Sequence, residues 1–166
     1  MNKNILFHFA LVLILVLSRF IPHPPNMTAI TAIALAGSVY VNLKTGVFVP
    51  LAAMIISDIF LGFHPILLFV YLSFFLIALI GMYLKTHKSV KNVVAATLLS
   101  SVLFFIVTNF GVWMSGTLYT TDIYGLQQCY IMAIPFFRNT LIGDFLYTAA
   151  VFSAFELSTQ NIKQTA

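Results

Sequence analysis

Few residues in this apolar sequence could do chemistry, and Asp144 is the clearest of them. In the segment IPFFRNTLIGDFLYTAAVF it has Thr140, Tyr147 and Thr148 at helical spacing, which places a polar stripe on one helix face. An ionisable group inside a membrane costs about 2.5 to 3.5 kcal/mol on insertion scales, so it faces a bundle interior or a cavity. Asp144 therefore either contacts a substrate or ion, or hydrogen-bonds a neighbouring helix and fixes its packing.

Two arginines offer cationic groups for a binding site. Arg138 lies about one and a half helical turns from Asp144 and about 120° away around the helix, so these two residues do not form a direct pair. Arg138 either snorkels to the membrane surface or pairs with Asp58 or with the anionic group of a ligand. The same choice applies to Arg19, in the proline-rich stretch SRFIPHPPNMTAI.

Asn109 and Trp113 end an apolar segment in the sequence TNFGVW. An asparagine is costly to bury without a hydrogen-bond partner. The tryptophan suits either a membrane interface or one wall of a binding pocket. Residues 114–129, rich in Tyr, Thr and Gly, are predicted to be a long outer loop, which would serve as a lid over a vestibule or as a plain connector.

Enzymatic signals are weak. The sequence has no H-E-x-x-H zinc pattern, no G-x-S-x-G elbow and no phosphate-binding glycine-rich loop, so it cannot itself use ATP. His23 and His64 with Asp58 could form a hydrolytic or metal site, which is the most remote of the functions considered. The single cysteine, Cys129, excludes an intrachain disulfide. We expect no cofactor and no bound metal.

The composition indicates what must position these residues. Of 166 residues, 61% are hydrophobic and 7% are charged, and the mean hydropathy is +1.02. These values predict an integral membrane protein with one domain, residues 1–166, embedded in a lipid bilayer. The net charge of +4 comes without a basic run interleaved with aromatic residues, so no nucleic-acid partner is expected.

Turn signals divide the chain into six predicted spans and give the fold class, an all-α bundle of six transmembrane helices. The spans are about 5–20, 27–41, 47–61, 65–84, 93–113 and 130–157. Lysines gather at one predicted face, whereas only Arg19 and Arg138 lie toward the other. The positive-inside rule therefore places both termini in the cytoplasm, and the even number of spans agrees. The predicted location is the cytoplasmic (inner) membrane of a bacterium.

Four stretches carry a resemblance to a known family. The sequences RFIPHPPNMTAITAIALAGSVY, PLAAMIISDIFLGFH, TNFGVW and GLQQCYIMAIPFFRNTLIGDFLY resemble a bacterial family of uncharacterised six-span membrane proteins. That family is similar to the substrate-binding S components of energy-coupling factor vitamin transporters. The likeness implies an outward-facing pocket that captures a micronutrient, together with a partner transmembrane subunit and two ATPases.

In S components, small-residue motifs on early helices serve as the partner face. Ala32 and Ala36, in the sequence AIALA, are the nearest match here, although they fall on the second predicted span rather than the first. Such a pair also suits close packing between helices of the same chain, and this internal alternative is slightly favoured.

The leading hypothesis is a membrane-embedded binding subunit for uptake of a small nutrient, vitamin-like or metal-containing, energised by partner ATPases. Arg138 would hold a carboxylate or phosphate, Asn109 and Asn139 would hydrogen-bond the ligand, Trp113 would stack on a ring, and Asp144 would anchor the pocket floor. The alternative is an inner-membrane scaffold, resembling rod-shape-determining subunits, whose polar residues serve packing. The full set of candidate substrate-binding residues is Arg19, Asn26, Asp58, His64, Asn109, Trp113, Arg138, Asn139 and Asp144.

Overall fold

The chain folds into helices joined by short loops. The structure is a computed structural model that describes residues 3–164, and side chains from His8 to Leu157. The helices are α1 (Lys3–Phe20), α2 (Ile30–Ala36) with its π-helical continuation η1 (Gly37–Val41), α3 (Leu43–Leu61), α4 (Leu67–Thr86), α5 (Val90–Met114) and α6 (Ile123–Gln164). No strand occurs in this described part of the chain. The predicted all-α fold is therefore confirmed.

Four of the helices are long and apolar enough to cross a bilayer, namely α3, α4, α5 and, within α6, residues Ile123–Leu157. Two further apolar segments, His8–Phe20 and Ile30–Val41, are shorter. This helix content is that of a membrane protein. Six crossings were predicted. That the two short segments also cross the bilayer stays a prediction.

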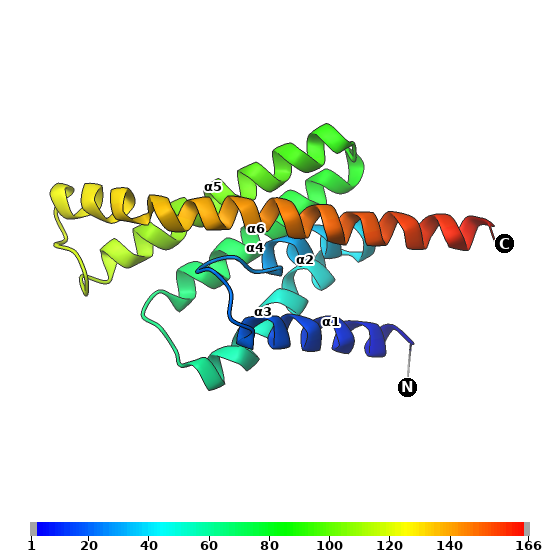
Figure 1. The fold of residues 1–166 in the computed structure, drawn as a ribbon, viewed down its shortest axis with the longest axis horizontal. Coiled ribbons are helices and arrows are strands. Elements are labelled where there is room, and N and C mark those ends of the chain that lie inside the picture. Colours follow the sequence, from blue (N-terminus) through cyan, green and yellow to red (C-terminus); the bar gives the residue numbers. More distant parts are fainter. Residues whose placement is uncertain (1–2, 165–166) are drawn as a thin grey trace.

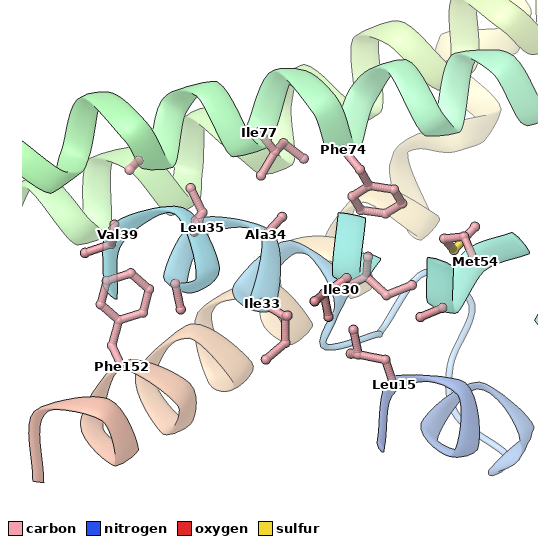
Figure 2. Close-up of a cluster of buried hydrophobic side chains, with 14 of the residues drawn as sticks. Leu15, Ile30, Ile33, Ala34, Leu35, Val39, Met54, Phe74, Ile77 and Phe152 are labelled. Carbon is pink, nitrogen blue, oxygen red and sulfur yellow. The ribbon is translucent and has the colours of Figure 1, made fainter. Parts of the chain in front are cut away.

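Helix α2 occupies the centre of the bundle. All seven of its residues are buried, and it contacts α3, α4, α5 and α6. Figure 2 shows Ile30, Ile33 and Leu35 of α2 among side chains that other helices supply, such as Leu15 and Ile77. A helix enclosed in this way has no face that must meet lipid, so it need not match the thickness of the bilayer.

Two glycines allow neighbouring backbones to approach α2 closely. A Cβ atom at Gly46 of α3 would lie 2.7 Å from the carbonyl oxygen of Ala34, and one at Gly81 of α4 would lie 2.8 Å from that of Leu35. Ala32 and Ala36 are 0% exposed. In this structure the two alanines serve packing within the chain, the internal alternative, and they offer no surface to a partner subunit.

Two predicted boundaries differ from the structure for identifiable reasons. The second span was expected to start at residue 27, yet α2 begins at Ile30 because Asn26 adopts a left-handed conformation with φ of 64° after two prolines. The expected loop 114–129 is partly helical, since α6 begins at Ile123. The Asp122 carboxylate accepts a hydrogen bond of 2.7 Å from the backbone N–H of Gly125, which caps the new helix.

The starts of the other spans fall within four residues of the predicted ones. Helix α3 begins at Leu43, earlier than expected, because the Asn42 side chain accepts a hydrogen bond from the Thr45 N–H at 2.9 Å. Ser89 caps α5 in the same way through the N–H of Asn92. The start of α1 and the end of α6 lie at the same end of the bundle, as an even number of crossings requires (Figure 1). The cytoplasmic assignment of that end stays a prediction, and the side chains of Lys3 and Lys163 lie outside the described set.

Candidate functional site

A cavity of about 460 Å³ lies at the end of the bundle where α1 connects to α2. We call it the Arg19 cavity. Its wall includes Arg19 of α1, Thr31 of α2, Met54 of α3, Phe74 of α4, and several residues of α5 and α6. All six helices therefore contribute to it. The volume lies within the range of about 300 to 1,000 Å³ that is usual for small-molecule sites.

Phenylalanines form much of the apolar wall. Phe105 of α5 and Phe137 of α6 have ring centroids 4.7 Å apart, and Phe74 of α4 and Phe104 of α5 have centroids 5.4 Å apart. Phe136 also lines the cavity. Aromatic walls of this kind bury the flat or apolar part of a ligand and leave orientation to a few polar groups.

The polar groups of the cavity come from several segments. His64, in the loop before α4, has a buried Nδ1 atom without a hydrogen-bond partner. Asn109 of α5 uses its side-chain N–H to donate to the Phe105 carbonyl at 2.7 Å. The hydroxyls of Thr108 and Thr140 donate to carbonyls one turn earlier in their own helices. The oxygen atoms of these two hydroxyls can still accept hydrogen bonds. A ligand could therefore donate a hydrogen bond to a threonine and pair a second polar group with His64 Nδ1.

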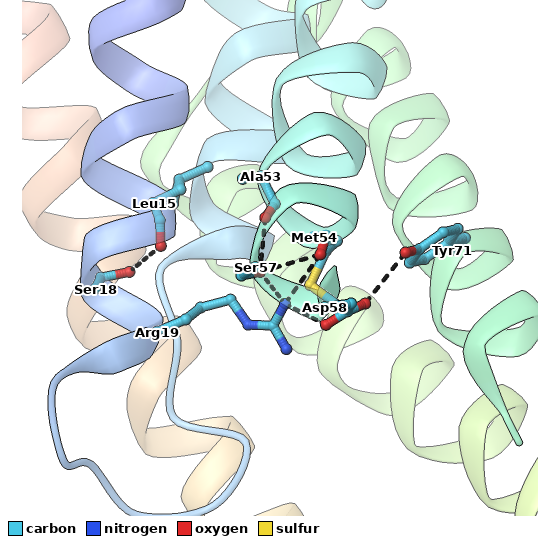
Figure 3. A network of polar contacts seen from close by, with 8 residues as sticks. All are labelled: Leu15, Ser18, Arg19, Ala53, Met54, Ser57, Asp58 and Tyr71. Carbon is cyan, nitrogen blue, oxygen red and sulfur yellow. Dashed lines mark hydrogen bonds and ion pairs between the residues drawn. The ribbon is translucent and has the colours of Figure 1, made fainter. Parts of the chain in front are cut away.

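Arg19 forms one edge of the cavity and is held there by a buried network (Figure 3). Its Nη1 atom donates to Asp58 Oδ1 at 2.7 Å, and it also donates to the Ser57 hydroxyl. The Tyr71 hydroxyl donates to Asp58 Oδ2 at 3.1 Å. The Asp58 side chain is 1% exposed, so the guanidinium neutralises a charge that would otherwise be buried without a counter-ion.

Asp144 lies away from this network. Asp144 is 2% exposed, and its carboxylate accepts a hydrogen bond of 2.7 Å from the Ser101 hydroxyl of α5. Thr140 and Thr148, one turn to either side on α6, are buried as well. The predicted polar stripe therefore faces the interior, and Asp144 lies behind the cavity wall rather than in it.

The structure brings together only part of the candidate set. Arg19, Asn26, His64 and Asn109 line the Arg19 cavity, and Asp58 supports it through Arg19. Four candidates on the last two helices lie outside it, Asp144 among them. Trp113 donates its indole N–H to the carbonyl of Asp122 at 3.1 Å and so ties the end of α5 to the following loop. Arg138 is exposed and Asn139 is partly buried.

Arg19, rather than Arg138, is the partner of Asp58. Among the described side chains, salt bridges join only Arg19 to Asp58 and Lys88 to Glu156. Both carboxylate oxygens of Asp58 accept hydrogen bonds, one from Arg19 and one from Tyr71. Asp58 was expected to group with His23 and His64. The two histidines line the cavity, whereas Asp58 is paired with Arg19 at its edge. The described residues contain no group of three or more His, Cys, Asp or Glu that could hold a metal ion.

Sequence reasoning missed the phenylalanines and Thr31. The pairs Phe104–Phe105 and Phe136–Phe137 are visible in the sequence, and they fall on the two helices that were expected to form the later walls of a pocket. Adjacent aromatic residues on an apolar helix are common, however, and only the packed bundle shows that both rings of each pair reach the cavity.

Comparison with known proteins gives a family but no activity. A family of unknown function, DUF6580, matches residues 1–165, and the chain belongs to that family. Neither a curated protein nor a solved structure matches the chain.

Proposed function

We propose that this DUF6580 protein is a membrane-embedded binding subunit for the uptake of a small nutrient, vitamin-like or metal-containing. The observation that carries the proposal is the Arg19 cavity, to whose wall all six helices contribute and which combines aromatic walls with few polar groups. Packing alone disfavours a buried histidine nitrogen that has no hydrogen-bond partner. In this cavity such a nitrogen lies with an asparagine beside five phenylalanines.

The chemistry of the cavity selects the kind of ligand. The phenylalanine walls favour a ring or another apolar body of vitamin size. His64 Nδ1 would donate to or accept from one polar group of the ligand, according to its tautomer. Arg19 already shares its charge with Asp58, so it would hydrogen-bond a neutral or weakly anionic group rather than neutralise a full phosphate.

The energy source belongs to the proposal too. The sequence has no nucleotide-binding motif, so a binding subunit of this size would work with a partner transmembrane subunit and ATPases, in a six-span fold like that of the S components. Ala32 and Ala36 are buried, and such a partner would therefore contact other residues. The long apolar helices offer lipid-facing surface for this purpose, for example at Leu68 and Ile59.

The scaffold alternative has an observation of its own. Arg19, Ser57 and Asp58 connect α1 to α3, and Asp144 and Ser101 connect α6 to α5, so the costliest polar residues all join helices. A protein whose only task is to hold a shape in the membrane would use them in this way.

A ligand screen separates the two functions. The protein would be purified in mild detergent, and its thermal unfolding would be followed with vitamins, corrinoids and metal ions. A ligand at 100 times its Kd stabilises the folded state by about 2.7 kcal/mol, which gives a clear shift. H64A should weaken that shift, whereas H87A should not, because His87 is exposed and lies between α4 and α5, outside the cavity. A flat screen with no copurifying ATPase would contradict the proposal and favour the scaffold.

A further inference from the structure

A second cavity, of about 690 Å³, lies between α5 and α6 toward the other end of the bundle. We call it the Lys88 cavity. Lys88 and Glu156 line it and form a salt bridge of 2.5 Å. Thr97 and Thr148 also line it. Thr148 lies about 12 Å from Glu156 along the helix axis, so the cavity runs from a charged, partly exposed end to a pair of hydroxyls in the bundle interior.

Asp144 stands between the two cavities. Thr140, one turn before it on α6, lines the Arg19 cavity, and Thr148, one turn after it, lines the Lys88 cavity. Ser101, which hydrogen-bonds Asp144, is one turn from Thr97 of the Lys88 cavity. Thr31 of α2 lies close to Asp144 and lines the Arg19 cavity. Each threonine on α6 is about 6 Å from Asp144 along the axis.

The hydrogen bonds around Ser101 suit Asp144 both with and without a proton. The Ser101 hydroxyl has two acceptors within reach, Asp144 Oδ2 at 2.7 Å and the Thr97 carbonyl at 3.1 Å, but only one hydrogen. When Asp144 is ionised, that hydrogen points to the carboxylate. When Asp144 is protonated, its O–H donates to Ser101, and the serine donates to Thr97. Neither state leaves Ser101 or the carboxyl oxygen unpaired.

Among the described side chains, no cation pairs with Asp144. Its hydrogen-bond partner, Ser101 of α5, does not titrate in the physiological range. A buried carboxylate without a counter-ion is strongly unfavourable as an anion, so a proton is the simplest species to neutralise it. The charged or titratable groups that line the cavities on either side are Arg19, His23 and His64 in one, and Tyr40, Lys88 and Glu156 in the other.

Thr148 supplies the link toward the Lys88 cavity. Its hydroxyl is buried and has no hydrogen-bond partner, although a helical threonine can donate to the carbonyl one turn earlier, as Thr140 does. The Thr148 hydroxyl lies one turn from Asp144, lines the Lys88 cavity and is free to take a hydrogen bond from either side.

From this arrangement we infer that Asp144 exchanges a proton with both cavities and is the midpoint of a proton pathway through the bundle. Hydronium in one cavity becomes water as its proton passes, through a neighbouring hydroxyl, to the Asp144 carboxylate. The resulting carboxylic acid passes its proton, through the hydroxyl on the other side, to water in the other cavity. No other bond changes. The inference goes beyond the proposed function, because it needs neither a nutrient nor an ATPase.

Proton flux in vesicles tests the inference directly. The purified full-length protein would be reconstituted in lipid vesicles that contain a pH-sensitive dye, with the membrane potential clamped, and the external pH would be lowered in one step. The interior of wild-type vesicles should acidify faster than that of vesicles without protein, and D144N should reduce the rate to that of empty vesicles. D122N, which alters an exposed loop acid, is the matched control and should behave as wild type.

Two further measurements keep the test decisive if D144N does not fold. T148V removes a hydroxyl that has no partner in the structure, so it should fold and should lose flux. In infrared difference spectra between two pH values, wild type should show the C=O band of a buried carboxylic acid, and D144E should shift that band. Flux equal to that of empty vesicles, flux unchanged in T148V, or flux that requires Na⁺ would each overturn the inference. None of these results depends on the nutrient screen, so failure here and failure of the proposed function are distinguishable.

Discussion

Removing the Arg19 side-chain charge should destabilise the fold more than removing the charge of its partner. In R19M, the Asp58 carboxylate keeps only the Tyr71 hydrogen bond, 3.1 Å long, while it stays buried. Deleting one partner of a buried ion pair typically costs about 3 to 5 kcal/mol because the other charge is left uncompensated. We expect a loss in that range.

D58N should cost less. The amide would keep the shape of the Asp58 side chain, and its oxygen could still accept from Arg19 or Tyr71. Arg19, which is 15% exposed, would also keep the Ser57 hydroxyl and could turn toward water in the cavity. The expected loss is about 1 to 3 kcal/mol, the usual effect of weakening a buried hydrogen bond. The double variant R19M/D58N should be more stable than R19M, since it no longer buries a lone charge.

Cys129 provides the assay. It is the only cysteine in the sequence and is 1% exposed, so a thiol-reactive fluorogenic dye reports unfolding in detergent without further labelling. Midpoints of denaturant unfolding would be compared for wild type, R19M, D58N and the double variant. The reasoning is refuted if R19M unfolds at the wild-type midpoint, or if D58N is less stable than R19M.

Three further outcomes follow from single contacts. Tyr71→Phe should cost about 1.5 to 3 kcal/mol in the same assay, because it removes a hydrogen bond to a charged group. Gly46→Ala should cost about 1 to 3 kcal/mol and more than Gly37→Ala, since its Cβ would approach the Ala34 carbonyl to 2.7 Å whereas the nearest atom to a Cβ at Gly37 is 3.1 Å away. The N–H of Gly125 holds the pKa of Asp122 below its usual range, so the cap is at full strength above the ordinary carboxyl pKa and is lost as pH falls through the lowered value. Hydrogen exchange at the start of α6, corrected for the intrinsic pH dependence of exchange, should therefore lose protection on acidification in wild type, and D122N should abolish that change.

Hydropathy and length were enough to predict the helices that meet lipid. The spans expected at 65–84 and 93–113 correspond to α4 at Leu67–Thr86 and α5 at Val90–Met114. In these helices the apolar run has nearly the length that a bilayer requires, and a lysine-bearing turn separates the two. Composition alone therefore locates them to within about three residues at each end.

Helix ends that depend on one side chain were harder to predict. Residues 114–129 were expected to be a loop because Tyr, Thr and Gly are common there, yet the Asp122 cap starts a helix in the middle of this stretch. Pro135 lies inside that helix. A polar composition indicates exposure to water, and an exposed segment can be helical when a cap satisfies its first N–H groups.

Sequence reasoning predicted only part of the lining of the Arg19 cavity. Arg19, His64 and Asn109 were chosen as costly polar residues near one end of the bundle, and they do line one cavity. Arg138 was chosen on the same ground and is exposed. Which face of a helix meets the interior depends on its rotation against its neighbours, and helical spacing fixes only the relative angles within one helix.

Buried polar atoms that lack partners are places to look for function in a helical bundle. Among the described side chains there are three, the hydroxyls of Ser38 and Thr148 and Nδ1 of His64. Packing alone selects against such atoms because each loses its hydrogen bonds to water and gains none in return. His64 lines the Arg19 cavity and Thr148 lines the Lys88 cavity. The satisfied pairs, Arg19 with Asp58 and Asp144 with Ser101, would serve a scaffold equally well, so the case for binding and proton exchange rests on the atoms that the fold leaves available beside its two cavities.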